Sequence, residues 1–361
     1  MKTTVCTNST VSTALQGLAS GLAFPSLYNL FSVWSCPQER ATLMTLAYAG
    51  NPTATVLTFP VSSWLCQSGL DGGWPLTFYV PGTTGLVWCL MFYLLVYSSP
   101  ATHPRINSSE RLYLTSNTST KEEKLEVPWL AMAKSPAVHA LWFTHLCSAF
   151  GFYLLNINLS IFIREALGFS VTENGLLSML PTLGMLVLSP AGKMFDMIRA
   201  RNCCQVTTLR KIFNSVGFFC PALAFIGIRL LPCEYKVGHV VLISLGMALH
   251  QLAISGGFYF SHAEVAGPYS GVLFGITNTM AQIPGFLTPV IVSSMTGSGQ
   301  MSEWYQVFTI AGLIYIVGGL VYIFLGTSES QNWAEKPDKL RETQAGDQCD
   351  PLLIRENSHT V

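Results

Sequence analysis

Charge is what this sequence has least of. Only 11% of its 361 residues are Asp, Glu, Lys or Arg, and half are hydrophobic. Soluble domains carry about 25% charged residues, so a surface this poor in charge suits lipid better than water. The 19 basic residues balance the 19 acidic ones. No overall attraction to nucleic acid is therefore expected.

Several chemical motifs are also missing. No G-x-x-x-x-G-K-[ST] phosphate loop occurs, so ATP-driven transport has no support. The ten cysteines lack the paired spacing and partner histidines of a zinc site, and no nucleophile elbow is present. We therefore expect no enzymatic activity, no cofactor and no metal. The cysteines are expected to be buried small hydrophobes.

Long apolar stretches dominate what is present. A bilayer crossing needs about 20 mostly apolar residues. Nine stretches meet this need, namely 11–33, 42–66, 75–97, 137–163, 174–195, 211–230, 238–260, 269–296 and 304–326. They predict an all-α polytopic membrane protein. Proline removes a helical hydrogen bond, so breaks are expected in the fifth stretch, at Pro181 and Pro190, and in the eighth, at Pro284 and Pro289.

The spacing of the stretches predicts four regions. A bundle of three spans (1–97) precedes a polar linker (98–136), a six-span bundle (137–326) and a polar tail (327–361) that is expected to be disordered. Basic residues concentrate in the linker, the tail and the loop 193–211, which places the C-terminus in the cytoplasm. The sequon at Asn8 then lies on the opposite side. Glycosylation is expected there, and not at the sequons of Asn107 and Asn117.

Several runs resemble one known family when they are taken in order. They include LQGLASGLAFP (15–25), PQERATLMTLAYAG (37–50), GGWPLTFYVPG (72–82), LGFSVTENGLLSMLP (167–181), TTLRKIFNSVGF (207–218) and GVLFGITNT (271–279). The family is the anion:cation symporters of the major facilitator superfamily, which include sodium/phosphate cotransporters, sialin and the vesicular glutamate transporters. The resemblance covers about residues 14–335. It implies the 6+6 facilitator fold built from 3+3 repeats, with the chain starting near the fourth helix and lacking roughly the first three.

That resemblance implies a function. The expected activity is secondary active transport of small organic anions or inorganic phosphate, coupled to protons or sodium, by alternating access. The expected partners are a small anionic solute, a coupling ion and the lipid bilayer, in the plasma membrane or a lysosomal or vesicular membrane. The alternative is a truncated isoform that does not transport, or a reading frame that continues upstream. A seven-helix receptor does not fit nine spans.

Two polar stripes are candidates for the substrate cavity. One lies on the first span, and the other lies on the fourth, with a further candidate in the eighth span. The candidates are Thr13, Gln16, Ser20 and Phe24 on the first, His145, Ser148, Phe152, Tyr153 and Asn156 on the fourth, and Asn278 beside Thr277 and Gln282 on the eighth. A polar stripe on an apolar helix faces either a cavity or another helix, and both readings stay open.

The resemblance also shows where charges have been substituted. The glutamate transporters and sialin carry an Arg at the position of Thr13 and a Glu at the position of Ser20. The glutamate transporters have a second Arg at the position of Ser148. Substrate recognition is therefore expected to rest on hydroxyl, amide and aromatic groups. His262 matches a family histidine, and Glu264 stands in place of a family Asp.

A gating motif is expected after the fifth span. The run GKMFDMIRAR (192–201) resembles the facilitator signature G-x-x-x-D-x-x-x-[RK]-[RK], with Gly192, Asp196, Arg199 and Arg201 at its key places. Asp196 would cap a neighbouring helix, and Arg199 or Arg201 would pair with a carboxylate. Such a latch holds one state of a rocking transporter and breaks in the other. The simpler alternative is a basic anchor at the membrane surface.

Overall fold

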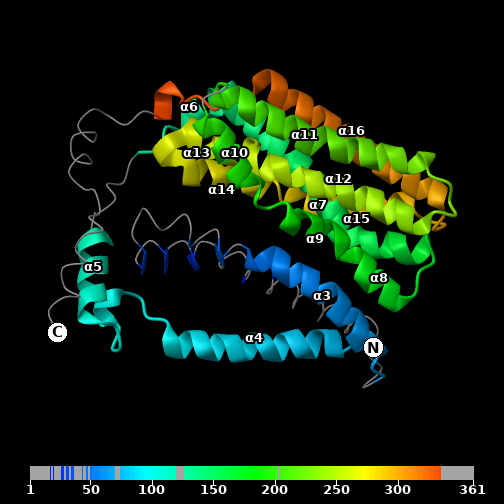
Figure 1. Ribbon diagram of the computed structural model, residues 1–361, viewed down its shortest axis with the longest axis horizontal. Coiled ribbons are helices and arrows are strands. Elements are labelled where there is room, and N and C mark those ends of the chain that lie inside the picture. The colour runs from blue at the N-terminus through cyan, green and yellow to red at the C-terminus, as the bar shows by residue number, and fades with distance from the viewer. Residues whose placement is uncertain are drawn as a thin grey trace. The chain divides into compact units, whose positions relative to one another are not determined.

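The computed structural model describes residues 50–69, 74–118, 126–201 and 204–334, together with single positions between 17 and 49. All helices and turns assigned there are α or 3-10, with no strand among the described residues (Figure 1). The predicted all-α class is confirmed. Most of the first predicted span, 11–33, lies outside the described residues.

The first described elements are α3 (Gly50–Gln67) and α4 (Leu76–Leu95), followed by η2 (Pro100–Thr102) and α5 (Ser108–Thr118). Helix α3 covers most of the second predicted span, and α4 covers most of the third. The chain divides into two compact units. One holds residues 1–50, 80–125 and 338–361, and the other holds 51–79 and 126–337.

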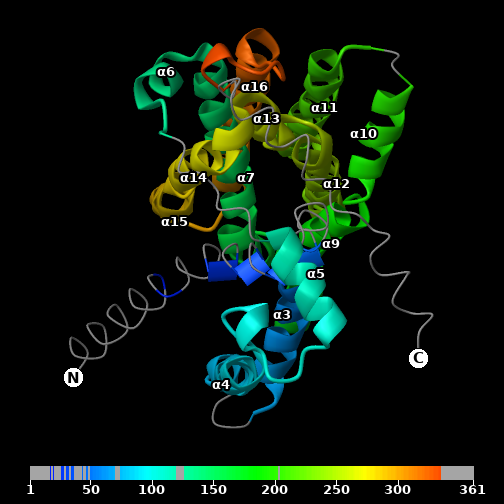
Figure 2. The ribbon, with the colours of Figure 1, turned by 90° about the vertical axis from the view of Figure 1, so that its left-hand side faces the viewer.

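The larger unit is a bundle in which α7 (Pro136–Glu165) is the longest helix. The short α6 (Trp129–Lys134) precedes it, and α11 (Val206–Gly227) and α16 (Met301–Leu325) are the other uninterrupted spans. Figure 2 shows α7 beside α14 (Ser270–Met280), α15 (Ile283–Met295) and α16, with α11 and α12 (Lys236–Gly256) on the other side of the bundle. Its core is aromatic. The fully buried rings include Phe162, Phe218, Phe225, Trp304, Phe308 and Tyr315.

Two predicted spans are interrupted. The fifth consists of α8 (Val171–Ser178), α9 (Leu180–Val187) and α10 (Ala191–Ala200), and the eighth consists of α14 (Ser270–Met280) and α15 (Ile283–Met295). Pro181 and Pro284 each sit in the first turn after a break, where a missing N–H costs least. Pro190 directly precedes α10. The expected break at Pro289 is wrong, because α15 continues through it to Met295.

The seventh span has an interruption that the sequence analysis did not predict. Helix α12 (Lys236–Gly256) ends at Gly257, and α13 (Phe258–Ala266) and η4 (Gly267–Tyr269) follow. A Cβ on Gly257 would lie 2.7 Å from the carbonyl oxygen of Ala253, so no larger residue fits this turn. Gly267 has φ +49°, which favours glycine. The turn at Gly257 sets the direction of α13, which carries His262 and Glu264.

The start of the tail is ordered, against the expectation of disorder from residue 327. The amide of Ser328 donates to Thr207 Oγ1 at 3.1 Å, and the amide of Gln331 donates to the carbonyl of Val265 at 3.1 Å. A 3-10 turn, η5 (Asn332–Ala334), follows, and Ala334 is buried. The expectation failed because backbone donors in this polar stretch find partners on α11 and α13. Residues 335–361 lie outside the described part.

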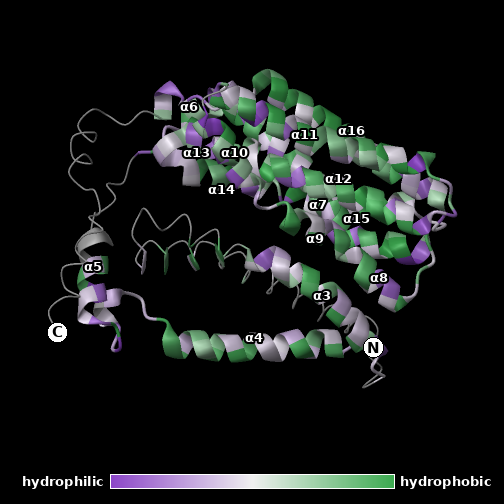
Figure 3. Cartoon of the chain, viewed as in Figure 1, coloured by the Kyte–Doolittle hydropathy of each residue, from purple (hydrophilic) through white to green (hydrophobic). Residues whose placement is uncertain are grey.

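The described helices have the length and composition of membrane spans. Six helical segments within the described residues are long and apolar enough to cross a bilayer, and one of them, Lys236–Met295, contains all of the seventh predicted span and nearly all of the eighth. Hydrophobic residues predominate along these helices, and hydrophilic ones gather towards their ends (Figure 3). This distribution matches an apolar slab with water on both sides. The chain is an integral multi-pass membrane protein.

Candidate functional site

Helix α7 carries the polar stripe predicted on the fourth span, and the structure divides that stripe into three groups. Ser148 faces α12, His145 faces α13 and α14, and Tyr153 faces α15. The three groups differ in how far their polar atoms are satisfied. That difference decides which of them can contact a solute.

Ser148 belongs to a closed network. Its hydroxyl lies 2.8 Å from His250 Nε2, and His250 Nδ1 lies 2.6 Å from the carbonyl oxygen of Gly217. Because a carbonyl only accepts, Nδ1 carries the hydrogen and Nε2 accepts from Ser148. Tyr315 donates to the carbonyl of Ser148 at 3.0 Å. The network is buried and joins α7, α11, α12 and α16, so Ser148 and His250 hold helices together.

His145 belongs to a buried histidine pair. Its Nδ1 lies 3.2 Å from Thr277 Oγ1, and Nε2 of His262 lies 2.9 Å from the same oxygen. His262 Nδ1 lies 2.9 Å from the carbonyl of Tyr259. The three side chains are at most 6% exposed. One threonine hydroxyl on α14 therefore connects imidazoles from α7 and α13.

Tyr153 belongs to an open group. Its hydroxyl donates to Gln282 Oε1, and its ring packs against Gly285, where a Cβ would lie 3.3 Å from three ring carbons. Gln282 is exposed, and Tyr153, Asn156 and Asn278 are half-buried. Phe152 contacts the Tyr153 ring edge to face, at 5.5 Å between ring centroids. Gln282 Nε2 in turn donates to the Asn278 carbonyl at 3.3 Å, and Asn156 lies three residues after Tyr153 on α7. We call these four partly open polar residues, Tyr153, Asn156, Asn278 and Gln282, the amide face.

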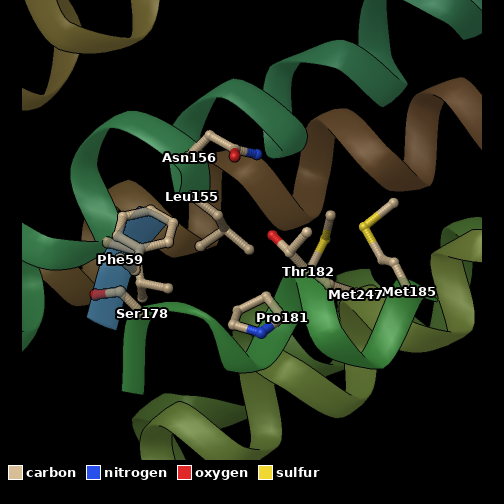
Figure 4. A pocket seen from close by; sticks show the side chains of 9 residues that line it. Phe59, Leu155, Asn156, Ser178, Pro181, Thr182, Met185 and Met247 are labelled. Atoms are coloured by element: carbon tan, nitrogen blue, oxygen red, sulfur yellow. The ribbon is translucent and has the colours of Figure 1, made fainter. Parts of the chain in front are cut away.

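A small cavity adjoins the amide face. Asn156 and Leu155 of α7 line it opposite Pro181 and Thr182 of α9, and Phe59 of α3 stands at one end (Figure 4). Its volume is ≈ 10 Å³, which is at the lower limit for one water molecule. No organic anion fits into this cavity in the present conformation. Contact with a solute would therefore have to come through the open side of the amide face.

Helix α3 contacts the start of α8. Ser63 Oγ donates to the carbonyl of Val171 at 2.5 Å, and Gln67 Nε2 donates to Thr172 Oγ1 at 2.5 Å. A Cβ on Gly175 would collide with Ser63 Oγ, so the glycine is required for this approach. Ser170 and Glu173 form a capping box that begins α8. The contact joins the second predicted span to the fifth.

The gating motif lies on α10, and its residues differ in their contacts. Gly192 allows close approach to α12, since a Cβ there would lie 3.4 Å from the carbonyl of Ser255. Asp196 is exposed, and within the described part of the chain it joins no ion pair and accepts no hydrogen bond. Arg199 Nη1 lies 3.5 Å from Glu264 Oε1. Arg201 is exposed at the end of α10.

A residue that the sequence analysis did not single out is central to this region. Arg210 on α11 is 4% exposed and forms a bidentate pair with Glu264, at 3.0 and 2.7 Å. Its Nη1 donates to the carbonyl of Gly256 at 3.1 Å, and its guanidinium lies 3.9 Å from the centroid of the Phe195 ring. The sequence analysis treated Arg210 only as one of the basic residues of loop 193–211, which were expected to lie at the membrane surface. The acidic residue at 264 was the available signal for a buried pair.

The remaining candidates cannot be placed. The residues of the first polar stripe, Thr13, Gln16, Ser20 and Phe24, lie outside the described residues, as does Asn8. Their roles stay predictions.

Comparison with known proteins decides the family. A family model described as "Major Facilitator Superfamily" matches residues 7–289. The chain belongs to the Major Facilitator Superfamily. It is 35% identical to human sialin over 89% of this chain and 64% of that protein, and 34% identical to human vesicular glutamate transporter 2 over 92% and 57%. The chain thus spans less than two thirds of the length of these relatives.

A solved structure supports the fold. This facilitator resembles the crystal structure of a bacterial homolog of the human lysosomal transporter Spinster, in an inward-facing and occupied conformation. The TM-score is 0.52 at 15% identity, over 84% of this chain and 73% of the other. At that identity the likeness concerns the fold alone. The predicted facilitator fold and the family resemblance are confirmed.

Proposed function

We propose that this facilitator is a secondary active transporter of small organic anions or inorganic phosphate, which works by alternating access and is coupled to protons or sodium. Its similarity to sialin and to vesicular glutamate transporters supports an anionic solute. The fold supports alternating access, because facilitator halves rock around a site near the middle of the membrane.

The amide face is the observation that carries the proposal. Tyr153 and Asn156 of α7, together with Asn278 and Gln282 beside the α14–α15 break, carry neutral hydroxyl and amide groups that the bundle leaves partly open. The Tyr153 hydroxyl donates to Gln282 here and would turn to a bound anion. Arg210, the buried cation among the described residues of the larger unit, is paired with Glu264 and so is not offered to a solute. A hydrogen bond from a neutral donor to an anion contributes about 1.5–3 kcal/mol. Several such bonds can replace the arginines that the glutamate transporters use.

Reconstitution of the purified full chain into proteoliposomes tests the proposal. Uptake of radiolabelled sialic acid, glutamate and phosphate is measured under an imposed pH gradient and, separately, under an imposed sodium gradient. We expect gradient-dependent uptake of at least one of these anions. The absence of uptake under both gradients would refute the proposal.

Matched tyrosine variants test the site itself. Tyr153→Phe keeps the ring against Gly285 and removes only the hydroxyl, so we expect uptake to fall by about 10-fold for one charge-assisted bond. Tyr235→Phe is the control, because Tyr235 is exposed at the start of α12. Equal uptake by the two variants would remove Tyr153 from the site.

The same preparation addresses the alternative of a form that does not transport. A chain that is monodisperse and cooperatively folded, yet inactive with every anion, would support that alternative. Orientation and location belong to the proposal too, with the C-terminus in the cytoplasm and the protein in the plasma membrane or a lysosomal or vesicular membrane. Antibody access to a C-terminal tag in intact cells, compared with permeabilised cells, tests the orientation.

A further inference from the structure

We propose that His145, Thr277 and His262 form a binding site for a single proton, so that the coupled ion is H⁺. The coupling part of this inference rests on the proposed function, whereas the proton site does not. The site is distinct from the amide face, although Thr277 directly precedes Asn278 on α14.

The argument starts from the hydroxyl of Thr277, which has three partners. Its oxygen lies 2.9 Å from His262 Nε2, 3.2 Å from His145 Nδ1 and 3.1 Å from the carbonyl oxygen of Phe274. A hydroxyl carries one hydrogen and two lone pairs. The carbonyl can only accept, so the Phe274 contact becomes a hydrogen bond only when Thr277 donates to it, in addition to the regular bonding of α14.

Counting hydrogens gives two states on the same heavy-atom frame. His262 Nδ1 lies 2.9 Å from the carbonyl of Tyr259, so that nitrogen carries a hydrogen in both. In the neutral state His262 Nε2 carries a lone pair and accepts a hydrogen bond from the Thr277 hydroxyl. At the same time His145 Nδ1–H donates to the Thr277 oxygen. The contact to Phe274 is then unused.

When one proton is added, all three contacts of the Thr277 hydroxyl become hydrogen bonds. The proton binds to His262 Nε2, which now donates to the Thr277 oxygen. The Thr277 hydroxyl rotates and gives its hydrogen to the Phe274 carbonyl at 3.1 Å, while His145 still donates to the second lone pair. All three distances fit this state, and no heavy atom has to move. The site therefore accepts one proton by a hydroxyl rotation.

The Ser148–His250 pair shows why this property is specific. It also places an imidazole against a hydroxyl in the bundle core, at 2.8 Å. Within the described residues, however, the Ser148 hydroxyl has no second partner to which it could turn. If His250 gained a proton, Nε2–H would donate to the Ser148 oxygen, and the hydroxyl hydrogen of Ser148 would have no acceptor among the described residues. Burial disfavours a charge without compensating hydrogen bonds, so His250 stays neutral while the Thr277 site has a spare acceptor.

The surroundings of the site are aromatic and contain few charges. The ring of Phe274 lies 5.4 Å from the His262 ring, which is within the range where a cation is attracted to an aromatic face. The titratable or charged groups on the elements around the site include Cys147 on α7, Tyr259 and Glu264 on α13, Arg210 on α11, Arg199 on α10, His250 on α12, and Tyr315 and Tyr322 on α16. Glu264 is paired with both arginines, so the proton meets no free carboxylate there.

The ligand atoms favour a proton over sodium. Two of the three atoms that meet at the site are imidazole nitrogens, and hard cations prefer a shell of several oxygen ligands. Thr277 and Asn278 are consecutive on α14, so a change at the proton site acts on the helix that carries part of the amide face.

A titration that needs no transport tests the proton site. The full chain, labelled with ¹⁵N-histidine, is placed in nanodiscs and its imidazole signals are followed with pH by NMR. We expect the wild type and Thr277→Ser, which keeps the hydroxyl, to show one histidine that gains a proton while remaining hydrogen-bonded. Thr277→Val should shift or abolish that transition. His139→Gln, on the exposed first turn of α7, should remove only its own signal. A transition unchanged in Thr277→Val would overturn the site.

Accumulation in proteoliposomes tests the coupling. If one proton moves with each anion, the equilibrium accumulation ratio changes about 10-fold for each pH unit of gradient, since a tenfold ratio is worth 1.4 kcal/mol. The expected slope is near one in the wild type and in Thr277→Ser, and near zero in Thr277→Val and His262→Gln. A wild-type slope of zero, with accumulation driven by sodium, would refute proton coupling. A wild type without any uptake would refute the proposed function and leave the NMR titration to decide the proton site.

Discussion

Neutralising Glu264 offers the sharpest test of how the charged end of the bundle works. Glu264 is the acceptor for two hydrogen bonds from Arg210, whose side chain is 5% exposed. The other partners of Arg210 are the Gly256 carbonyl and the rings of Phe195 and Phe260, none of which carries a charge. Glu264→Gln removes the charge and keeps the shape. Arg210 is then buried with no countercharge within reach among its described partners.

The expected cost follows from that geometry. Breaking a buried ion pair by removing one partner costs about 3–5 kcal/mol. The Glu264 side chain is 18% exposed, so some water reaches the pair and the lower end of that range applies. For a domain of this size the loss corresponds to about 5–10 °C in the melting temperature. We expect this change in a detergent-solubilised chain followed by intrinsic tryptophan fluorescence.

Two further variants separate the pair from general damage. Arg199→Gln should cost less than about 1 kcal/mol, because Arg199 is half exposed and lies 3.5 Å from Glu264. The double variant Arg210→Met with Glu264→Leu removes both charges and should recover most of the stability, since apolar pairs can replace buried ion pairs. If the double variant loses as much stability as the single variants Arg210→Met and Glu264→Leu do together, the pair is not coupled and the reasoning fails.

Three other substitutions test close contacts in the bundle. Ser148→Ala leaves His250 Nε2 buried without a donor and should cost about 1–3 kcal/mol, seen as a lower melting temperature; no change would show that water replaces the hydroxyl. Gly217→Val should destabilise the α11–α12 contact by about 1–3 kcal/mol by the same measurement, because a Cβ would lie 2.5 Å from that of Ala253, whereas Gly271→Val, with open space around it, should not. Gly175→Leu should separate α8 from Ser63, so a cysteine placed at 63 should label faster with a maleimide, and unchanged labelling would contradict the contact.

Helical periodicity predicted the polar stripe of α7 but not the difference among its members. His145, Ser148, Phe152 and Asn156 follow one face, and the structure gives them to different neighbours. The Ser148 hydroxyl is buried and hydrogen-bonded because His250 of α12, which lies 102 residues later in the sequence, packs against it. Periodicity describes one helix at a time, so it cannot distinguish a sealed polar residue from an open one.

Helix breaks were predictable only where the cause is local. The breaks before Pro181 and Pro284 follow from the missing N–H of proline itself. The break at Gly257 depends on how closely Ala253 and Asn214 approach it, and Asn214 belongs to another helix. Pro289 was expected to break a helix and does not. A membrane helix tolerates the one hydrogen bond that this proline removes when neighbouring helices protect its backbone. Arg210 was missed for the same reason, because its partner is 54 residues away.

The break between α14 and α15 connects the two parts of the proposed mechanism. Discontinuous helices in transporters place backbone and side-chain groups at ion and substrate sites. Here the last residues of α14 include Thr277 of the proton site and Asn278 of the amide face, and Gln282 lies in the break itself. Gln282 accepts from Tyr153 and donates to the Asn278 carbonyl at 3.3 Å. Thr277 therefore lies one residue from Asn278 and shortly before the break, so a rotation of its hydroxyl would act close to the amides of the proposed solute site.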